Sequence, residues 1–197
     1  MADRYRAVLL FGAPGVGKGT QGGVLGAVPG FCHVSTGDLF RALDPESELG
    51  REFKHYSSQG LLVPDEFTVK LWSGSMASWA DAGRFDPARD VLVLDGFPRN
   101  VTQAEMIRDR VDVLAVVHLK AKDRDAMIAR LKNRAIEQGR HDDAKEDVIV
   151  NRWKVYEQET SPVLECYDGS LVHEVDAMGT PAEVLQRVLG VVVPAVG

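Results

Sequence analysis

The sequence predicts an α/β fold, in which a five-stranded parallel sheet carries helices on both faces. Two observations lead to this prediction. Short, unbroken apolar runs recur along the chain, and such runs are typical of strands buried on both sides. Segments with helical patterning separate these runs, so strands and helices alternate throughout. At 197 residues, the chain has the length of one compact domain with a sizeable core.

The five expected strands coincide with the apolar runs at residues 7–11, 31–34, 91–94, 113–119 and 171–175. Their apolar character is continuous rather than alternating, which favours parallel pairing. Ligands of such sheets bind outside the carboxyl ends of the strands. The segments that follow three of the strands, residues 12–21, 35–37 and 95–96, are therefore expected to converge on one crevice.

Helices are expected between the strands, at about 18–28, 36–41, 46–58, 65–79, 101–109, 124–135, from about 145 to an interruption around Pro162, and from 181 onward. Capping signals support several starts: Ser35 opens the second helix, Asp65 is interpreted as the cap of the fourth, and Thr180 begins a capping box. Gly22, Gly23 and Gly26 each lower helix stability by up to about 1 kcal/mol relative to alanine, so the first helix is expected to be loose. Residues 36–64 are poor in aliphatic side chains, which indicates a flap on the sheet.

The stretch after the first strand is rich in glycine and ends in lysine. Gly12, Gly17 and Lys18 fit the P-loop pattern G-x-x-x-x-G-K-[ST], but Gly19 stands where a hydroxyl is usual, and Thr20 follows it. Backbone N–H groups and a helix N-terminus at such a loop bind phosphate. A switch GTPase or motor ATPase is expected to keep the hydroxyl in its usual place. The alternative, a glycine-rich turn with a chance lysine, does not account for the buried strand before it.

Several basic side chains lie beside expected loops: Arg41, Arg99, Arg130, Arg134, Arg140 and Arg152. Arg130 and Arg134 are four residues apart on an expected helix and share one face. Phosphoryl transfer requires positioning and charge neutralisation, which arginines supply. Asp95 ends a buried strand, where a carboxylate facing phosphates acts through magnesium and its waters. Taken singly, each arginine also fits an ordinary surface position, and Asp95 also fits a turn or a helix cap.

Composition excludes several classes of protein. The formal net charge of −6 argues against a general nucleic-acid-binding surface. Cys32 and Cys166 lack metal-site spacing and are expected to be reduced structural thiols, in agreement with a cytoplasmic location. No apolar run reaches about 18 residues and no signal peptide precedes the first strand, so no membrane span is expected.

The residues quoted above, taken together, resemble the adenylate kinase family of nucleoside monophosphate kinases. The matching segments keep the family's order and cover nearly the whole chain: residues 12–21, 35–41, 60–66, 94–99 with Gln103, and 139–143. The displaced hydroxyl at Thr20 is itself the family's P-loop variant. The resemblance implies a P-loop NTPase-type core of residues 1–35, 65–133 and 146–197, an AMP-binding flap of residues 36–64 and a short lid of residues 134–145.

The resemblance also implies the reaction and its residues. The expected reaction is reversible transfer of the terminal phosphate of ATP to AMP, giving two ADP, with Mg²⁺ near Asp95 through water. The residues expected to bind ATP are Gly15, Val16, Gly17, Lys18, Gly19, Thr20, Arg130, Arg134 and Gly179. Those expected to bind AMP are Thr36, Arg41, Leu61, Leu62, Val63, Gly96, Phe97, Pro98, Arg99, Gln103, Arg140 and Arg152. The implied catalytic set is Lys18, Arg99, Arg130, Arg134, Arg140 and Arg152. The short lid lacks the four-cysteine site of long lids, so no structural zinc is expected.

Within this family, two positions bear on the accepted base. Gln103 offers the donor and acceptor pair that suits adenine, whereas the related UMP/CMP kinases tend to carry Asn there and Ala at the position of Thr36. UMP/CMP kinase is the alternative enzyme. A catalytically idle nucleotide-binding module and a GTP-driven switch are the alternatives from other classes, and the chain lacks an N-K-x-D guanine motif.

Two further expectations come from the resemblance. The flap and the lid are expected to close over AMP and ATP, with ATP, AMP and ADP as the partners of a monomer that contacts neither nucleic acid nor membrane. The stretch from Arg140 to Arg152 is one residue longer than the family's usual spacing, and one residue turns a helix face by about 100°.

Overall fold

The computed structural model describes residues 4–138 and 145–197. Its strands are β1 (Tyr5–Phe11), β2 (Phe31–Ser35), β3 (Val91–Asp95), β4 (Val111–Lys120) and β5 (Val172–Asp176). Its α-helices are α1 (Lys18–Leu25), α2 (Thr36–Arg41), α3 (Glu48–Ser57), α4 (Asp65–Asp81), α5 (Val101–Ile107), α6 (Arg124–Gln138), α7 (Glu146–Val155) and α8 (Pro181–Val196). Shorter helical turns are η2 (Tyr156–Thr160), η3 (Ser161–Cys166) and η4 (Gly169–Leu171).

The five strands form one parallel sheet in the order β2-β3-β1-β4-β5. The predicted fold class and all five predicted strands are confirmed. β1 lies at the centre, where Leu9 pairs with Leu94 of β3 on one side and with Val116 of β4 on the other. Because β1 is central, the segment that follows it opens at the middle of the sheet's carboxyl edge.

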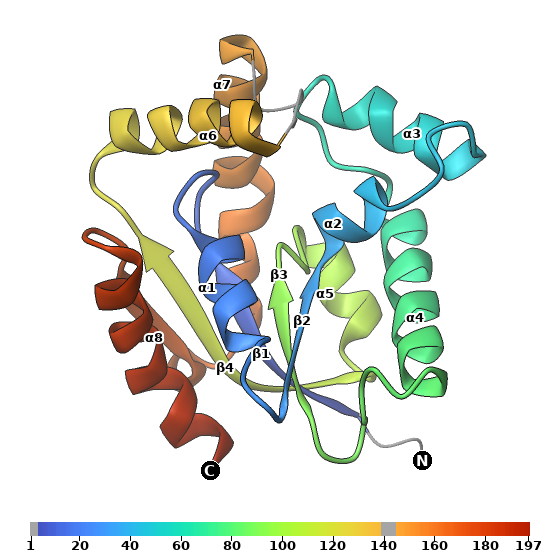
Figure 1. Ribbon diagram of the computed structural model, residues 1–197, viewed down its shortest axis with the longest axis vertical. Coiled ribbons are helices and arrows are strands. Elements are labelled where there is room, and N and C mark those ends of the chain that lie inside the picture. Colours follow the sequence, from blue (N-terminus) through green and yellow to red (C-terminus); the bar gives the residue numbers. More distant parts are fainter. Residues whose placement is uncertain (1–3, 139–144) are drawn as a thin grey trace.

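The sheet is buried on both faces, which explains the unbroken apolar runs. Val8 and Leu10 of β1 pack in the cluster that also contains apolar residues of α1, α6, α7 and α8. Leu9 and Phe11 pack in the opposite cluster, against α4, α5 and η3. Figure 1 shows α1 and α8 along one side of the sheet and α4 with α5 along the other. The inner strands β1 and β3 therefore bury apolar side chains at successive positions, whereas the edge strands β2 and β5 also carry polar or exposed ones.

Above the carboxyl ends of the strands, two helical segments approach from opposite sides. Figure 1 shows α6 on the side of β4 and α3 on the side of β2, both beyond the strand arrowheads. Within α2 and α3, the rings of Phe40 and Phe53 stack at 5.2 Å with an interplanar angle of 7°. The predicted flap thus consists of two helices joined through their own aromatic contact.

The glycines of α1 have a packing role that the sequence interpretation did not find. A Cβ at Gly22 would lie 2.4 Å from His33 Nε2, and one at Gly26 would lie 2.4 Å from His33 Cβ. Gly23, in contrast, has nothing within 4 Å. Two of the three glycines therefore make room for a histidine of β2 beneath α1.

Two local predictions differ from the structure, and a third, the interruption around Pro162, is confirmed and specified. α1 ends at Leu25, three residues earlier than expected, since the chain turns at the cap Gly26. Asp65 is the first residue of α4 and not its cap, and no side-chain capping bond is present there. The interruption at Pro162 takes the form of a π-helical turn, η2, followed by the 3-10 turn η3. Among the described helices, none has the length and apolar character needed to cross a membrane.

Candidate active site

A cleft of about 650 Å³ lies at the carboxyl edge of the sheet. Its walls come from the loops after β1, β2 and β3, from the flap helices α2 and α3, and from α6 and α7. The three strand ends that the sequence places together, beginning at Gly12, Ser35 and Asp95, all line this one cleft. Its volume is in the range of small-molecule binding sites.

The loop between β1 and α1 requires glycine at specific positions. Gly12 has a φ of +144°, and a Cβ there would lie 2.5 Å from Leu119 O. Gly15 has a φ of +83°, and a Cβ there would lie 2.6 Å from Met127 O. The loop is therefore pressed against β4 and α6, and it leads into the N-terminus of α1, whose first N–H groups have no partner within the helix.

Lys18 lies at the start of α1, with its side chain folded back over this loop. Its Nζ donates to Gly12 O at 2.6 Å and to Ala13 O at 3.2 Å. Burial lowers the pKa of Lys18 from 10.5 to about 8. The Asp95 carboxylate opposes this shift, whereas Arg99, Arg152 and Arg134 lower the pKa further. The ammonium thus occupies a partly buried site whose walls already contain other cations.

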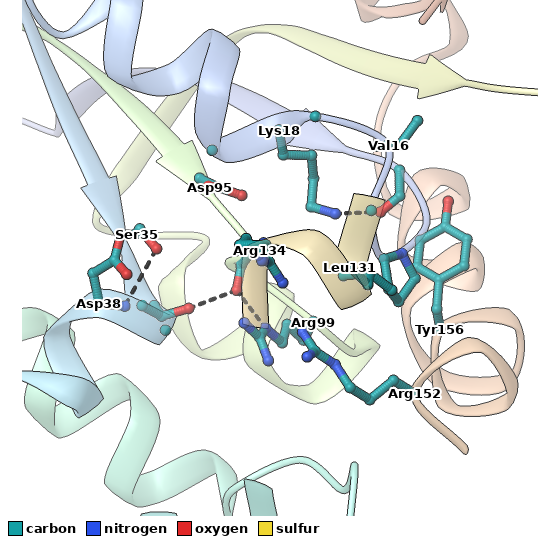
Figure 2. A pocket seen from close by; sticks show the side chains of 18 of the residues that line it. Val16, Lys18, Ser35, Asp38, Asp95, Arg99, Leu131, Arg134, Arg152 and Tyr156 are labelled. Carbon is teal, nitrogen blue, oxygen red and sulfur yellow. Dashed lines mark hydrogen bonds between the residues drawn. The ribbon is translucent and has the colours of Figure 1, made fainter. Parts of the chain in front are cut away.

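Figure 2 shows Arg99, Arg134 and Arg152 around the same cavity as Lys18. They come from three elements: the loop after β3, α6 and α7. Arg130 also lines the cleft, one turn before Arg134. Arg152 faces the cleft despite the longer spacing that precedes it. Arg140, the remaining arginine of the predicted set, lies outside the described residues.

Elsewhere in the cleft, side chains from α2, α5 and the loop after β3 are joined by hydrogen bonds. The hydroxyl of Thr36 donates to Gly96 O at 2.7 Å, and Arg99 Nε donates to the same oxygen at 2.8 Å. The Gln103 side chain accepts from the backbone N–H of Arg99 at 2.8 Å. Arg41 forms an ion pair with Asp38 at 2.8 Å and also lines the cleft.

Comparison with known proteins decides the family. A family model described as "Adenylate kinase" matches residues 10–171. The chain belongs to the adenylate kinase family. The adenylate kinase of Kocuria rhizophila is 39% identical over 92% of this chain and 96% of its own length. The adenylate kinase of Mycobacterium ulcerans is 43% identical over the same shares, and that of Thermobifida fusca is 39% identical over 92% of this chain and 95% of its own length.

As in other adenylate kinases, use of ATP implies Mg²⁺, and the donors around Asp95 fit this ion. Asp95 is 8% exposed, and its Oδ2 lies 3.6 Å from His33 Nε2. A Cβ at Gly19 would lie 3.4 Å from the same oxygen, and Thr20 lines the cleft nearby. Among the described residues, no group of three or more His, Cys, Asp and Glu could hold a metal ion. The ion would therefore need oxygens from nucleotide phosphates and water, as Mg²⁺ commonly does.

Of the predicted nucleotide-binding residues that the structure describes, most line the cleft of this adenylate kinase and two do not. Gly15 to Thr20, Leu61 to Val63, Gly96 and Gly179 are among those that do. Phe97 and Pro98 are absent from its walls: Phe97 is 1% exposed and packs against Trp72, with ring centroids 5.2 Å apart. The Phe97 side chain is part of the core, and Pro98 is buried as well.

The cleft also contains residues that sequence reasoning missed: Phe40, Phe53, Asn133, Glu137, Tyr156 and Thr160. Thr160 donates to Arg99 O at 2.7 Å and so holds the loop that carries Arg99. The Tyr156 hydroxyl lies 3.1 Å from His118 Nε2. Burial raises the pKa of Tyr156 to about 12. In the sequence, two of these residues could have been noticed: Phe40 and Phe53 are large apolar side chains in an otherwise polar segment.

Proposed function

We propose that this adenylate kinase binds ATP and AMP at opposite ends of the cleft and transfers the terminal phosphate of ATP to AMP reversibly, giving two ADP. One observation carries the proposal: a single cleft is lined by a glycine-rich loop with its lysine, by Gln103 with its polar neighbours, and by several arginines. Two nucleotides bound in this way would meet at their phosphates.

On the donor side, the loop from Gly15 to Thr20 holds the phosphates of ATP, with Lys18 as a mobile charge. Arg130 and Arg134 approach from α6, and the backbone at Gly179 contacts adenine. Mg²⁺, when bound with ATP, neutralises phosphate charge near Asp95. Lys18 now donates to Gly12 O and Ala13 O, and these bonds are exchanged for phosphate oxygens when the nucleotide binds.

On the acceptor side, Gln103 contacts the base of AMP, with Thr36 and the backbone from Leu61 to Val63 around it. Arg41 and Arg99 hold the AMP phosphate. Arg152, and Arg140 by the family resemblance, neutralise the phosphate during its transfer. The charge that develops on the transferring group is stabilised by these fixed cations rather than by covalent chemistry.

Closure of the flap and the lid completes the site. We assign the flap to residues 36–64, the lid to residues 134–145 and the remainder to the core. Gly60, with a φ of +71°, lies near the end of the flap. The backbone carbonyl of its neighbour Gln59 accepts a hydrogen bond from Asn151 Nδ2 of α7 at 2.7 Å. Closure would exclude water, which otherwise competes with AMP for the phosphate. Scattering with and without a bisubstrate analogue measures it, and an unchanged radius of gyration would rule it out.

The reaction is tested with a panel of acceptors. With ATP and Mg²⁺, AMP is expected to be phosphorylated far faster than CMP or UMP, because a base site that hydrogen-bonds its ligand discriminates strongly. A preference for CMP or UMP would instead make the chain a UMP/CMP kinase. All the proposed ligands of both nucleotides lie on one chain, so we propose a monomer, which light scattering of the purified protein checks.

A further inference from the structure

The amide of Gln103 is held from both sides by groups of opposite hydrogen-bonding character. Its Nε2 donates to Asp65 Oδ1 at 2.8 Å, and its Oε1 accepts from the backbone N–H of Arg99 at 2.8 Å. Gln103 is 1% exposed, yet it forms part of the cleft wall. Its orientation is thus determined by the protein and not by solvent.

These two partners allow only one orientation of the amide. An ionised carboxylate only accepts hydrogen bonds, and a backbone N–H only donates them. If the amide of Gln103 turned over, its oxygen would face the Asp65 carboxylate and its NH₂ group would face the Arg99 N–H. Both contacts would then be repulsive, and buried polar groups left unpaired are costly.

Asp65 is itself held in place. Asn100 Nδ2 donates to the same Asp65 oxygen at 2.8 Å, while Asn100 Oδ1 accepts from the Gln103 backbone N–H at 2.8 Å as the N-cap of α5. Asp65 is also the first residue of the long helix α4, where the helix dipole favours a negative charge. Asp65, Asn100 and Gln103 therefore form a closed hydrogen-bond network in which each residue orients the next.

The fixed amide retains one N–H and one oxygen lone pair for a ligand. The Watson–Crick edge of adenine presents an acceptor at N1 and a donor at the 6-amino group, in that order. A 6-oxo purine such as hypoxanthine presents the reverse, a donor at N1 and an acceptor at O6. An amide that cannot turn over can therefore complement only one of these two edges.

We propose that Asp65 is a specificity-determining residue, which locks the Gln103 amide in the orientation that accepts 6-aminopurine and rejects 6-oxopurine nucleoside monophosphates. Asp65 acts through Gln103 and is a positioning residue, not a catalytic one. The inference rests on the proposed binding of the AMP base at Gln103.

The test compares AMP with inosine monophosphate as acceptors for the wild-type enzyme and for Asp65→Ala. Without the carboxylate, the amide can turn over. We expect KM for AMP to rise about tenfold, the equivalent of one charge-assisted hydrogen bond, with kcat nearly unchanged. The ratio of kcat/KM for AMP to that for inosine monophosphate should fall by at least about tenfold. A merely structural role would weaken both acceptors alike and leave the ratio unchanged.

Glu66→Ala is the matched control. It removes the same charge from the same first turn of α4, but Glu66 is exposed and lies outside the cleft wall. Its acceptor ratio should equal that of the wild type. The conservative variant Asp65→Asn keeps an accepting oxygen and should retain most of the discrimination.

A second variant keeps the inference testable if Asp65→Ala does not fold. Asn100→Asp preserves a good N-cap for α5 but replaces the donor to Asp65 with a second carboxylate, which repels Asp65. It should lower the acceptor ratio in the same direction. If the wild type phosphorylates AMP and the folded variants keep its acceptor ratio, the inference is overturned and the proposed function stands. If the wild type does not phosphorylate AMP, the proposed function itself fails.

Discussion

The two ends of the cleft are built on different principles. At the phosphate end, Lys18 donates to carbonyls of its own loop, and burial, with smaller contributions from Arg99, Arg152 and Arg134, lowers its pKa. At the base end, Gln103 is bonded through both its amide nitrogen and its amide oxygen to other protein groups. The phosphate end is a cluster of like charges in a partly buried site, whereas the base end centres on one amide that two protein groups hold in place.

The difference follows from what each end binds. Phosphate carries several negative charges, so crowded cations that repel one another gain a large free energy when it arrives. A base offers only a few neutral hydrogen bonds, so discrimination requires groups that are already in place. In the proposed mechanism, the phosphate end therefore supplies rate and affinity, and the base end supplies selectivity.

The largest effect is expected when the Lys18 charge at the phosphate end is removed. Lys18→Ala should lower kcat on the order of a thousandfold or more, because charge neutralisation is the main catalytic contribution in phosphoryl transfer. A coupled ADP-formation assay measures this, and circular dichroism checks that the variant is folded. Full activity would remove Lys18 from the mechanism and would break the comparison.

Arg99→Ala should have the next largest effect, a loss of kcat of about a hundredfold. Arg99 contributes to the phosphate end by charge and to the acceptor loop through its bond to Gly96 O. Arg108→Ala is the matched control, since Arg108 is exposed and lies outside the cleft wall. Equal activities of the two variants would contradict the role of Arg99.

Gly22→Ala tests the packing beneath the phosphate end. The added methyl group would meet the His33 ring, so we expect a loss of about 1–3 kcal/mol in the free energy of unfolding. Gly23→Ala, in the same helix but with open space, should instead stabilise by up to about 1 kcal/mol. Urea denaturation compares the two, and similar values for both would show that His33 does not limit the packing of α1.

The smallest expected effect is a change in bound protons. Burial lowers the pKa of Lys18 in the folded protein to about 8, against 10.5 when unfolded. Below pH 8 the buried charge therefore lowers stability, and this penalty declines as the pH rises from about 8 to 10.5. Phosphates should restore the charged form, so ATP binding near pH 8 should take up a fraction of a proton.

Calorimetry in buffers with different enthalpies of ionisation measures this uptake. Lys18→Met, which cannot titrate, is the control and should take up less. Equal proton uptake by the wild type and Lys18→Met would show that Lys18 does not take up the proton when ATP binds.

Local patterns were sufficient to predict the sheet and the phosphate loop. The apolar runs at residues 7–11 and 91–94 identify buried strands because both sheet faces are covered. The loop from Gly12 to Lys18 is identified because its glycines are needed at fixed places in the chain. In both cases the requirement leaves a local pattern in the sequence, although the contacts that impose it, such as those of Gly12 with Leu119 and of Gly15 with Met127, are distant.

The parts that the sequence could not predict depend on contacts between distant segments. Gly22 and Gly26 are explained only by His33 of another element, and Asp65 serves the Gln103 amide rather than its own helix. Phe97 belongs to the family motif but faces Trp72 in the core, because the backbone turns after Gly96. A one-dimensional pattern does not contain the direction of such a side chain.

The stacked pair of Phe40 and Phe53 has a consequence for how this family diversifies. Both rings belong to one continuous segment, so α2 and α3 carry part of their cohesion with them. We therefore expect that this segment can be exchanged between homologues, with junctions near Ser35 and Gly60. A chimera carrying a pyrimidine-kinase cassette should fold and change its substrate only in part, since Gln103 and Asp65 remain behind in the recipient.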